Sequence, residues 1–506
     1  MTDRLHSFTL ADIVRENSRT FPDATALVCG DDRMSYPQVD ERVNRTANVL
    51  VELGVRSGDR VCWIGLNCHR LFELIFACSK LGAIATPLNW RLTAAEVSGI
   101  LRDLTPGVVI CDGSDEFAEV RAVAHEAAPE AVLAINDGSY ESRLSRAAAT
   151  DPDKDDDDEA PVLQIMTAAF AGKPRGALLT SRGIVQQNLL HAAVGNIHPV
   201  DDVYLGSGPM FHIGVLLRTF AIFHWGGTNV IVPRTEPDQM CRMIERERCT
   251  MAFLFAPTIR QIVELNEDGA YDLSSLTDAG AGVPPQDVAE AWYAMTSCVP
   301  PSRPPTTGYG TTETVGMVTY EQRPPATSGT FGRPSPAMAV RIVDDRGLEV
   351  PAGQIGEIVV RGPQVMAGYF GQPPMDPNGW RNTGDLGRRE ADGGVSFLGP
   401  NHDMVKTGME NVYPVEVENA LRNHPSVTEA CVFGLPDPEW GQSVQAVVEV
   451  KGDPQPSADE LIEFVRDQIA SYKKPKAVTV VRSLPRANGF VDRAAAKEIH
   501  ERSREA

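Results

Sequence analysis

Short apolar, β-branched runs alternate with helical patterns through the first third of the chain. Residues 60–67 (RVCWIGLN) and 107–112 (GVVICD) have the composition of buried strands. Residues 69–83 (HRLFELIFACSKLGA), which lie between them, repeat apolar positions with helical spacing. Strands that alternate with helices in this way are typical of βαβ units with a parallel sheet. The pattern therefore predicts an α/β domain.

The pattern changes twice towards the C-terminus. Between about residues 329 and 399, strand-like runs such as 339–345 (AVRIVDD) and 356–362 (GEIVVRG) are spaced by Gly and Pro turns, which indicates a β-rich subdomain. A helix, two strands, a helix and a strand follow, at residues 414–424, 427–437, 443–450, 457–470 and 477–485. We therefore predict an N-terminal domain, 1–399, and a small α+β domain, 400–506.

Length, net charge and cysteine content exclude several classes of protein. A chain of 506 residues exceeds what one hydrophobic core usually fills, so more than one domain is expected. The net charge of -21 argues against a nucleic-acid partner, which needs a basic surface. Nine cysteines, from Cys29 to Cys431, show no CxxC spacing, so we expect reduced thiols and no metal site. The N-terminus lacks a signal-peptide pattern and the apolar run 71–88 is interrupted by charge and Pro, so we expect a cytoplasmic protein without membrane insertion.

An acidic run, residues 151–161 (DPDKDDDDEAP), interrupts the α/β pattern, and we interpret it as a solvated linker rather than a binding patch. It leads to a predicted buried strand, 162–166 (VLQIM), and then to a loop, 167–176 (TAAFAGKPRG). A Gly-rich loop after a parallel strand is a common phosphate site. In this loop, however, residues 168–171 have no hydroxyl and can meet phosphate oxygens only through backbone N–H groups.

Four stretches now occur in a specific order: 167–181 (TAAFAGKPRGALLTS), 308–316 (GYGTTETVG), 380–387 (WRNTGDLG) and 403–418 (DMVKTGMENVYPVEVE). Together they resemble the adenylate-forming superfamily, which includes acyl-CoA synthetases, peptide-synthetase adenylation domains and beetle luciferases. The resemblance implies a large domain of stacked α/β sheet subdomains plus a β-rich subdomain, with a small mobile α+β domain. It also implies two reactions in one site: a carboxylate attacks ATP to give an acyl-adenylate, and a thiol then displaces AMP.

The motifs that hold an adenylate are intact. By the resemblance, Tyr309 stacks on adenine, Thr312 bonds the α-phosphate, Asp385 accepts the ribose hydroxyls, and Glu313 matches a Mg-associated glutamate that would be a leftover if no triphosphate binds. A carboxylate suits a ribose diol because it accepts two charge-assisted hydrogen bonds. The implied adenylate-binding set is Gly280, Ala281, Gly282, Gly308, Tyr309, Gly310, Thr311, Thr312, Glu313 and Asp385.

The motifs that make an adenylate are broken. The family loop has Ser/Thr-Gly-Thr-Thr around the β- and γ-phosphates, where this chain has Ala168, Ala169, Phe170 and Ala171. Phe490 stands where the family has a C-terminal Lys that reaches the reacting phosphate, and Pro400 where it usually has an Arg. Loss of a cation that faces developing charge typically costs about a hundred- to thousand-fold in rate. A shifted lysine is a possible rescue, but Lys497 lies seven residues beyond Phe490, too far for a side chain to compensate.

The motifs for thiol transfer persist. By the resemblance, His402 lies at the hinge of the small domain, and Thr407, Gly408 and Met409 line the tunnel for the pantetheine arm of CoA. Met409 replaces a common second Gly and would reshape that tunnel. Lys406 on the same loop is a candidate to bind the AMP phosphate during thiol transfer. No metal ligands are predicted.

Two further stretches match the thiol-transfer half. Tyr472 and Lys474 match an aromatic and basic pair that binds the CoA nucleotide, and Lys473 and Lys476 add to a basic cluster that is otherwise read as a solvated surface. His212 in PMFHIGV matches the gating residue beside the acyl pocket. The catalytic candidates are therefore His212, Thr312 and Lys406. Apolar stretches at 209–217, 253–258, 280–285 and 314–318 predict a pocket for a hydrophobic acid.

The sequence thus predicts an acyl-CoA ligase homologue that performs only the second half-reaction, with coenzyme A and acyl-AMP as substrates and without ATP or Mg. The acyl-AMP would come from a separate adenylating enzyme. These departures resemble the non-adenylating acyl-CoA ligases of platensimycin-type diterpenoid biosynthesis, which implies a bulky polycyclic acid. Two alternatives stay open: a conventional ATP-dependent acyl-CoA synthetase, and a non-catalytic acyl-adenylate binding protein.

Overall fold

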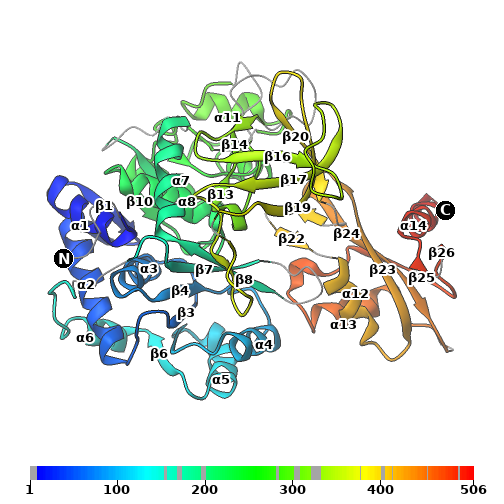
Figure 1. Ribbon diagram of the computed structural model, residues 1–506, viewed down its shortest axis with the longest axis horizontal. Helices are drawn as coiled ribbons and strands as arrows, with labels where there is room; N and C mark the ends of the chain where they lie inside the picture. The colour runs from blue at the N-terminus through cyan, green and yellow to red at the C-terminus, as the bar shows by residue number, and fades with distance from the viewer. Residues whose placement is uncertain are drawn as a thin grey trace.

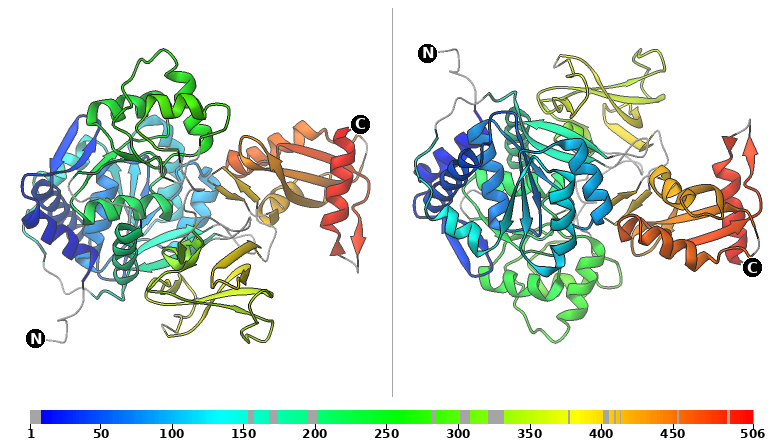
Figure 2. Two further views of the ribbon diagram at one scale, coloured as in Figure 1. Left: turned by 90° about the horizontal axis from the view of Figure 1, so that it is seen from above. Right: turned by 90° about the horizontal axis from the view of Figure 1, so that it is seen from below.

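A large domain and a smaller one to its side make up the molecule (Figures 1 and 2). The computed structural model describes residues 8–152, 157–167, 174–194, 201–280, 284–300, 308–320, 332–376, 378–400, 405–408, 410–412, 414–452, 454–487 and 490–505. The predicted α/β fold class is confirmed: two mainly parallel sheets with helices form the body of the large domain.

One seven-stranded sheet has the order β18-β8-β7-β4-β3-β5-β6. Its strands are β3 Arg60–Ile64, β4 Ile84–Pro87, β5 Val108–Asp112, β6 Val132–Asn136, β7 Pro161–Thr167, β8 Arg175–Thr180 and β18 Gly368–Tyr369. The strands from β7 to β6 pair in parallel, as predicted, whereas β8 runs antiparallel to both β7 and β18. The connecting helices include α3 His69–Leu81, α4 Ala94–Leu104, α5 Ala118–Ala127 and α6 Gly138–Leu144, with the short turn η1 Asp115–Phe117.

A second, five-stranded sheet has the order β11-β9-β10-β1-β2. Its strands are β1 Thr25–Cys29, β2 Asp32–Ser35, β9 Val203–Gly206, β10 Thr228–Ile231 and β11 Met251–Ala252, and its helices are α1 Leu10–Thr20, α2 Tyr36–Glu52, α7 Ser181–Val194, α8 Ile213–His224, α9 Pro237–Glu247, α10 Ala256–Leu265 and α11 Ala289–Met295. The core between the two sheets is continuous. In it, the ring of Phe72 on α3 lies edge-on to Phe223 on α8, with centroids 4.9 Å apart.

The predicted β-rich subdomain is an antiparallel sheet of order β16-β17-β19-β20. It comprises β16 Ala339–Val343, β17 Ile355–Arg361, β19 Arg381–Arg389 and β20 Val395–Pro400. Short pairs precede it: β12 Gly310–Thr311 with β13 Gly316–Met317 around η3 Thr312–Thr314, and β14 Thr319–Tyr320 with β15 Arg333–Pro334. Because β20 pairs with β19 as far as Pro400, the sheet reaches the predicted boundary at 399/400, which stays a prediction.

The small domain packs two helices and a third, terminal helix on one five-stranded sheet. The strands are β21 Val405–Thr407, β22 Glu410–Val412, β23 Val427–Asp437, β24 Gly441–Val450 and β25 Ala477–Val481, and the helices are α12 Pro414–Arg422, α13 Ala458–Arg466 and α14 Arg493–Glu505, with η4 Ser471–Lys473. A hairpin, β26 Arg486–Ala487 and β27 Phe490–Val491, precedes α14. Figure 1 shows α12 and β22 towards the large domain, and β26 and α14 at the opposite end.

The acidic run differs from its prediction as a solvated linker. Asp151 accepts hydrogen bonds from Arg15 at 2.8 Å and from Lys80 at 2.7 Å. Asp158 is buried and pairs with Arg182 at 2.9 Å. The described ends of the run are therefore fixed to the large domain by ion pairs, because basic side chains distant in sequence meet them.

The predicted phosphate loop also sits in a different context. The chain leaves β7 and returns in antiparallel β8, so the described residues on either side of this loop belong to two antiparallel strands rather than to a strand and a helix. Helix α7 begins only at Ser181, after β8, so a helix N-terminus does not follow this loop directly. Within the described ranges, no helix has both the length and the apolar character needed to cross a bilayer.

Candidate active site

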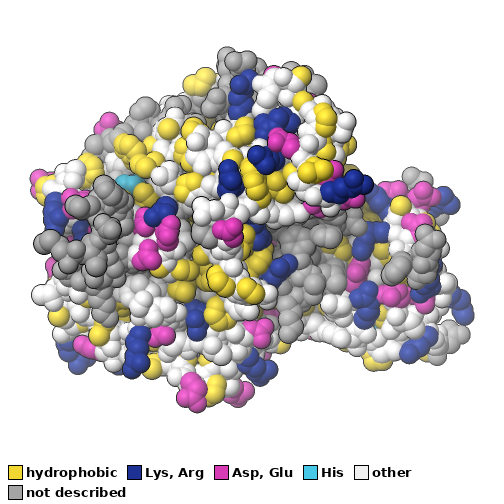
Figure 3. Space-filling model, in the orientation of Figure 1, with side chains coloured by type: hydrophobic (Ala, Val, Ile, Leu, Met, Phe, Trp, Pro, Cys, Tyr) yellow, Lys and Arg dark blue, Asp and Glu magenta, His cyan; other side chains and the backbone are white. Residues whose placement is uncertain are grey.

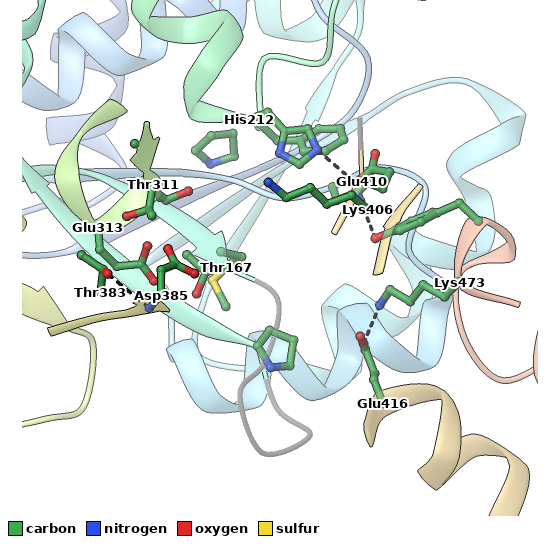
Figure 4. Close-up of a pocket in the computed structure, with 18 of the residues that line it drawn as sticks. Thr167, His212, Thr311, Glu313, Thr383, Asp385, Lys406, Glu410, Glu416 and Lys473 are labelled. Carbon is green, nitrogen blue, oxygen red and sulfur yellow. Dashed lines mark hydrogen bonds and ion pairs between the residues drawn. The ribbon is translucent and has the colours of Figure 1, made fainter. Parts of the chain in front are cut away.

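A cavity of about 250 Å³ lies where the small domain meets the large one. It brings together sequence motifs that are hundreds of residues apart (Figure 4). Among its lining residues are Asn89, Thr167, Phe211, His212, Gly308, Tyr309, Gly310, Thr311, Thr312, Glu313, Thr383, Asp385 and Phe397 from the large domain, and Lys406, Glu410, Glu416, Tyr472 and Lys473 from the small domain. Both domains therefore contribute polar groups to one site.

A tyrosine and an aspartate form the cavity wall that the sequence predicts to face a nucleotide. The hydroxyl of Tyr309 donates a hydrogen bond to Asp385 Oδ2 at 2.6 Å, and its ring stacks on Phe397 with centroids 5.4 Å apart. Burial raises the pKa of Asp385, while the Tyr309 hydrogen bond and the charge of Lys406 oppose that rise. Burial likewise raises the pKa of Tyr309, which keeps the phenol protonated as a donor. The phenol thus holds the carboxylate in a fixed orientation.

Glycines and a tight turn shape the neighbouring strand pair. A Cβ on Gly310 would lie 2.0 Å from the carbonyl oxygen of Gly316, and one on Gly308 would lie 2.2 Å from that of Thr319. After the turn η3, Val315 takes a left-handed conformation with φ 48°, and Thr314 donates a hydrogen bond to the Gly316 carbonyl at 2.7 Å. Only glycine fits at the two tight positions. The turn then presents Thr311, Thr312 and Glu313 to the cavity.

Glu313 is engaged by protein partners. Its Oε1 accepts a hydrogen bond from the Tyr369 hydroxyl at 2.6 Å, and that hydroxyl accepts one from Arg381 at 3.0 Å. Arg175, in the loop motif, lies over the same tyrosine ring at 4.6 Å. Among the described residues, no group of three His, Cys, Asp or Glu side chains is placed to hold a metal ion. A single carboxylate such as Glu313 suffices for Mg²⁺ that is held mainly by substrate phosphates.

His212 lies at the residue before α8, and its side chain contacts the small domain rather than the helix N-terminus. Its Nε2 lies 3.1 Å from Glu410 Oε2, and Arg91 pairs with the other oxygen of the same carboxylate. Burial by itself would raise the pKa of Glu410, but His212, Arg91 and Lys473 outweigh it and the pKa is lowered. The candidate gate is therefore held by a carboxylate from the other domain.

Lys406 on β21 reaches the nucleotide side of the cavity from the small domain. Its Nζ lies 5.1 Å from the centroid of the Phe397 ring, and its charge is felt by Asp385. Figure 4 shows the side chain pointing between His212 and the wall formed by Thr311 and Asp385. An ammonium in this place can neutralise a phosphate that leaves as AMP.

Of the two residues predicted to bind the CoA nucleotide, Tyr472 and Lys474, only Tyr472 is among the described residues that line the cavity. Tyr472 lines the cavity, and Arg91 lies over its ring at 5.5 Å. Lys473, rather than Lys474, accompanies it in the described lining, and Lys476 pairs with Asp437 at 2.8 Å. On the face shown in Figure 3, basic and acidic side chains of the small domain are interspersed. Positive charge for an anionic nucleotide would therefore have to be local.

Several predicted site residues do not line the cavity, and others are not among the residues that the structure describes. Gly408 has φ +60° and a Cβ there would lie 3.0 Å from the Trp440 ring, so glycine is required between Thr407 and β22. Gly280 also has a left-handed φ, of +69°, and a Cβ there would lie 3.0 Å from the carbonyl oxygen of Ala252 at the end of β11. Outside the described residues are Ala168, Ala169, Phe170, Ala171, Ala281, Gly282, His402 and Met409.

The two C-terminal positions that the sequence predicts to be degenerate, Pro400 and Phe490, lie apart. Pro400 ends β20 directly opposite Asp385, close to the nucleotide wall. Phe490 begins β27, in the hairpin with β26 at the far end of the small domain (Figure 1). Lys497 follows the buried Ala496 on α14, which packs at that same end. In this domain orientation, the Lys406 loop faces the cavity and the Phe490 hairpin does not.

Sequence reasoning did not identify Arg91, Glu96, Glu410 or Phe397, and it counted Lys473 only within a cluster. Glu410 lies in the same motif as Lys406, and Glu96 completes a Thr-x-x-Glu capping box with Thr93, so both had a local signal. Arg91 and Phe397 belong to no sequence motif that could have identified them. Their roles follow from contacts across the domain boundary.

Known proteins match almost the whole chain. Residues 14–370 match the family model "AMP-binding enzyme", and residues 416–489 match "AMP-binding enzyme C-terminal domain". An indoleacetate–CoA ligase from Aromatoleum aromaticum is 32% identical over 497 residues, covering 94% of this chain and 95% of that protein. A fatty acid–[acyl-carrier-protein] ligase from Streptomyces coeruleorubidus is 32% identical over 504 residues, covering 96% and 95%.

The structural comparison agrees. An o-succinylbenzoate CoA synthetase from Bacillus subtilis, bound to a product analogue, superposes with a TM-score of 0.79 at 26% identity, covering 96% of this chain and 98% of that one. The sheets, the two-domain layout and the ordered motifs are thus those of one family. The chain belongs to the AMP-binding, adenylate-forming enzymes and is a member of their acyl-CoA ligase type.

Proposed function

We propose that this enzyme catalyses only thioesterification, converting acyl-AMP and CoA to acyl-CoA and AMP. The observation that carries the proposal is the position of Lys406 beside Asp385 and Phe397, with the Phe490 hairpin at the opposite end of the small domain. The second half-reaction needs a cation near the leaving phosphate, and Lys406 supplies one. The first half-reaction needs a cation that Phe490 cannot supply in any orientation.

In the proposed step the CoA sulfur attacks the acyl carbon and forms the C–S bond. The C–O bond to the phosphate breaks, AMP leaves with the electron pair, and the thiol proton passes to solvent. Asp385 holds the ribose diol, Tyr309 supports the adenine, and Thr312 and Lys406 bind the phosphate. His212 borders the acyl group. AMP is already a good leaving group, so orientation and access contribute most of the remaining acceleration.

The acceptor arm would enter past Thr407 and Gly408, with Tyr472 and Lys474 near the CoA nucleotide. One relative is named for an acyl-carrier-protein acceptor, so a carrier-protein thiol is the main competitor of CoA. The acyl-AMP would be supplied by a separate adenylating enzyme, and the acid would be hydrophobic and bulky, such as a polycyclic diterpenoid acid. The apolar stretch around His212 supports that substrate class.

A conventional ATP-dependent ligase is the second candidate. The indoleacetate–CoA ligase relative favours it, because the two chains align over nearly their full length. A non-catalytic acyl-adenylate binder is the third. One experiment separates them: acid with ATP, Mg²⁺ and CoA in one tube, and synthetic acyl-AMP with CoA in another. Thioester in the second tube alone supports the proposal, thioester with pyrophosphate in the first supports the conventional ligase, and binding of acyl-AMP without thioester supports the binder.

A further inference from the structure

A buried lysine at the domain boundary has two carboxylate partners, one from each domain. Lys473 on η4 is 4% exposed, and its Nζ donates to Glu96 Oε1 at 2.9 Å and to Glu416 Oε1 at 2.6 Å. Glu96 belongs to α4 of the large domain and Glu416 to the first turn of α12 in the small domain. Figure 4 shows Lys473 and Glu416 at the side of the cavity away from Asp385. The ammonium therefore bridges the two domains.

The large-domain carboxylate is fixed before the lysine meets it. Its second oxygen, Oε2, accepts hydrogen bonds from the backbone N–H of Thr93 at 2.9 Å and from the Thr93 hydroxyl at 3.0 Å. This capping box satisfies the first turn of α4 and leaves Oε1 free for Lys473. A carboxylate that is already ordered loses little side-chain entropy when it pairs, so the contact is stronger than a flexible surface pair.

The local charges keep the bridge ionised. Burial alone would lower the pKa of Lys473, but Tyr472, Glu416 and Glu96 outweigh burial and the pKa is raised. Two of the three donors of the ammonium are committed to these carboxylates. Lys473 is therefore poorly suited to bind a CoA phosphate. The bridge also lies next to Tyr472, whose hydroxyl accepts a hydrogen bond from Asn89 of the large domain at 3.4 Å.

We propose that Lys473 and Glu96 form an interdomain latch that holds the small domain in the orientation presenting Lys406 to the nucleotide site. The two residues are positioning residues, since they act through the placement of the small domain rather than on the reacting atoms. Rotation of the small domain would separate Lys473 from Glu96. The inference deepens the proposed function, because an enzyme with one half-reaction needs one orientation only.

The test uses supplied acyl-AMP and CoA, so that only the thiol step is measured. Glu96→Gln keeps an acceptor for the capping box but removes the charge, and Lys473→Gln removes the ammonium. Each variant should lower kcat by at least about ten-fold, because a buried charge that loses its partner weakens the hold on the small domain. The dissociation constant for acyl-AMP should stay within about two-fold, because its binding groups lie mainly on the large domain. The double variant should be no slower than either single one, since both remove one interaction.

Two controls sharpen the result. Lys473→Arg should retain most of the activity. Asp12→Asn changes another carboxylate in a Thr-x-x capping box, on α1 and remote from the small domain, and should leave kcat unchanged. Thermal unfolding of every variant separates lost folding from lost orientation, and Lys473→Arg with Glu96→Gln still test the latch if Lys473→Gln does not fold.

Other results would overturn the latch. Additive losses in the double variant, an unchanged kcat in both single variants, or a rise in KM for CoA alone after Lys473→Gln would each do so; the last would make Lys473 a CoA ligand. If the wild-type enzyme forms acyl-CoA from acid and ATP, the proposed function fails instead. The double-mutant cycle still reports on the latch in that case, because it starts from acyl-AMP.

Discussion

The hydroxyl of Tyr309 donates a 2.6 Å hydrogen bond to Asp385, and this pair couples the aromatic wall of the cavity to the carboxylate that we propose binds the ribose. The pair joins two motifs that are 76 residues apart in sequence. Burial raises the pKa of Asp385, so the phenol has an energetic as well as an orienting effect: it stabilises the ionised form that a ribose diol requires.

The first prediction concerns Tyr309→Phe, which keeps the ring but removes the hydroxyl. The pKa of Asp385 should rise further, because a hydrogen bond that lowers it is lost. Asp385 is ionised at pH values above its pKa, and the ionised form is lost as the pH falls through that pKa. Acyl-AMP binding by the variant should therefore weaken several-fold at neutral pH and begin to fail at a higher pH than wild-type binding does.

Calorimetric titration with acyl-AMP or AMP from pH 5 to pH 8 measures both effects. Tyr271→Phe is the matched control, because its hydroxyl also donates to a carboxylate, Asp238, at 2.6 Å, but outside the cavity lining. Identical pH profiles for wild type and Tyr309→Phe would show that the phenol does not tune Asp385.

Glu410→Gln tests the contact between the candidate gate and the small domain. The change leaves Arg91 without its counter-charge and weakens the hold on His212. A buried charge that loses its partner typically costs about 3–5 kcal/mol, partly relieved here because Arg91 is one-third exposed, so we expect the thiol step to slow by at least about ten-fold. Because the pKa of Glu410 is lowered, its ionised form persists below the usual value of 4.5, and its contribution is lost only as the pH falls through that lowered pKa.

Stopped-flow or quenched-flow assays with acyl-AMP and varied CoA give the rate. Glu460→Gln, on the exposed side of α13, is a suitable control in the same domain. Retention of the wild-type rate by Glu410→Gln would separate the His212 contact from catalysis.

The fold was predictable because its signals are local. Periodicity identified β3, α3 and β5 and, in the small domain, the order α12, β23, β24, α13 and β25, since buried strands and amphipathic helices show their pattern within a few residues. It did not predict β21, β22 or the terminal helix α14. The interdomain contacts have no such signal. Arg91 and Glu410 are separated by 319 residues, and Glu96 and Lys473 by 377, so no spacing rule could pair them. The same limit explains the acidic run, where the partners of Asp151 and Asp158 come from α1, α3 and α7.

Lys80→Met tests how strongly that run is fixed. Lys80 is fully buried, and its Nζ contacts Asp40, Asn44 and Asp151 at 2.8, 2.6 and 2.7 Å. Removal of the ammonium leaves the carboxylates of Asp40 and Asp151 near each other without their shared positive charge. This should lower the free energy of unfolding by about 3 kcal/mol.

Denaturant unfolding followed by circular dichroism measures the loss. Lys451→Met, at an exposed position directly after β24 in the small domain, should change stability by less than about 0.5 kcal/mol. A Lys80→Met protein as stable as the wild type would mean that the Asp40 and Asp151 carboxylates find other partners.

The final prediction concerns the half-reaction that we propose this enzyme lacks. Phe490→Lys returns a cation to the C-terminal hairpin, and Phe170→Gly removes bulk from the loop that meets pyrophosphate in the family. A cation facing charge at phosphorus is worth about a hundred- to thousand-fold, so the double variant should show pyrophosphate exchange with acid and ATP above the wild-type background. Phe490→Lys alone should gain less, because residues 168–171 still lack the hydroxyls that hold the β- and γ-phosphates. Phe490→Met, which is uncharged, is the matched control and should gain nothing. Strong exchange by the unmodified enzyme would instead show that its own side chains complete adenylation, and the enzyme would then be a conventional ATP-dependent ligase.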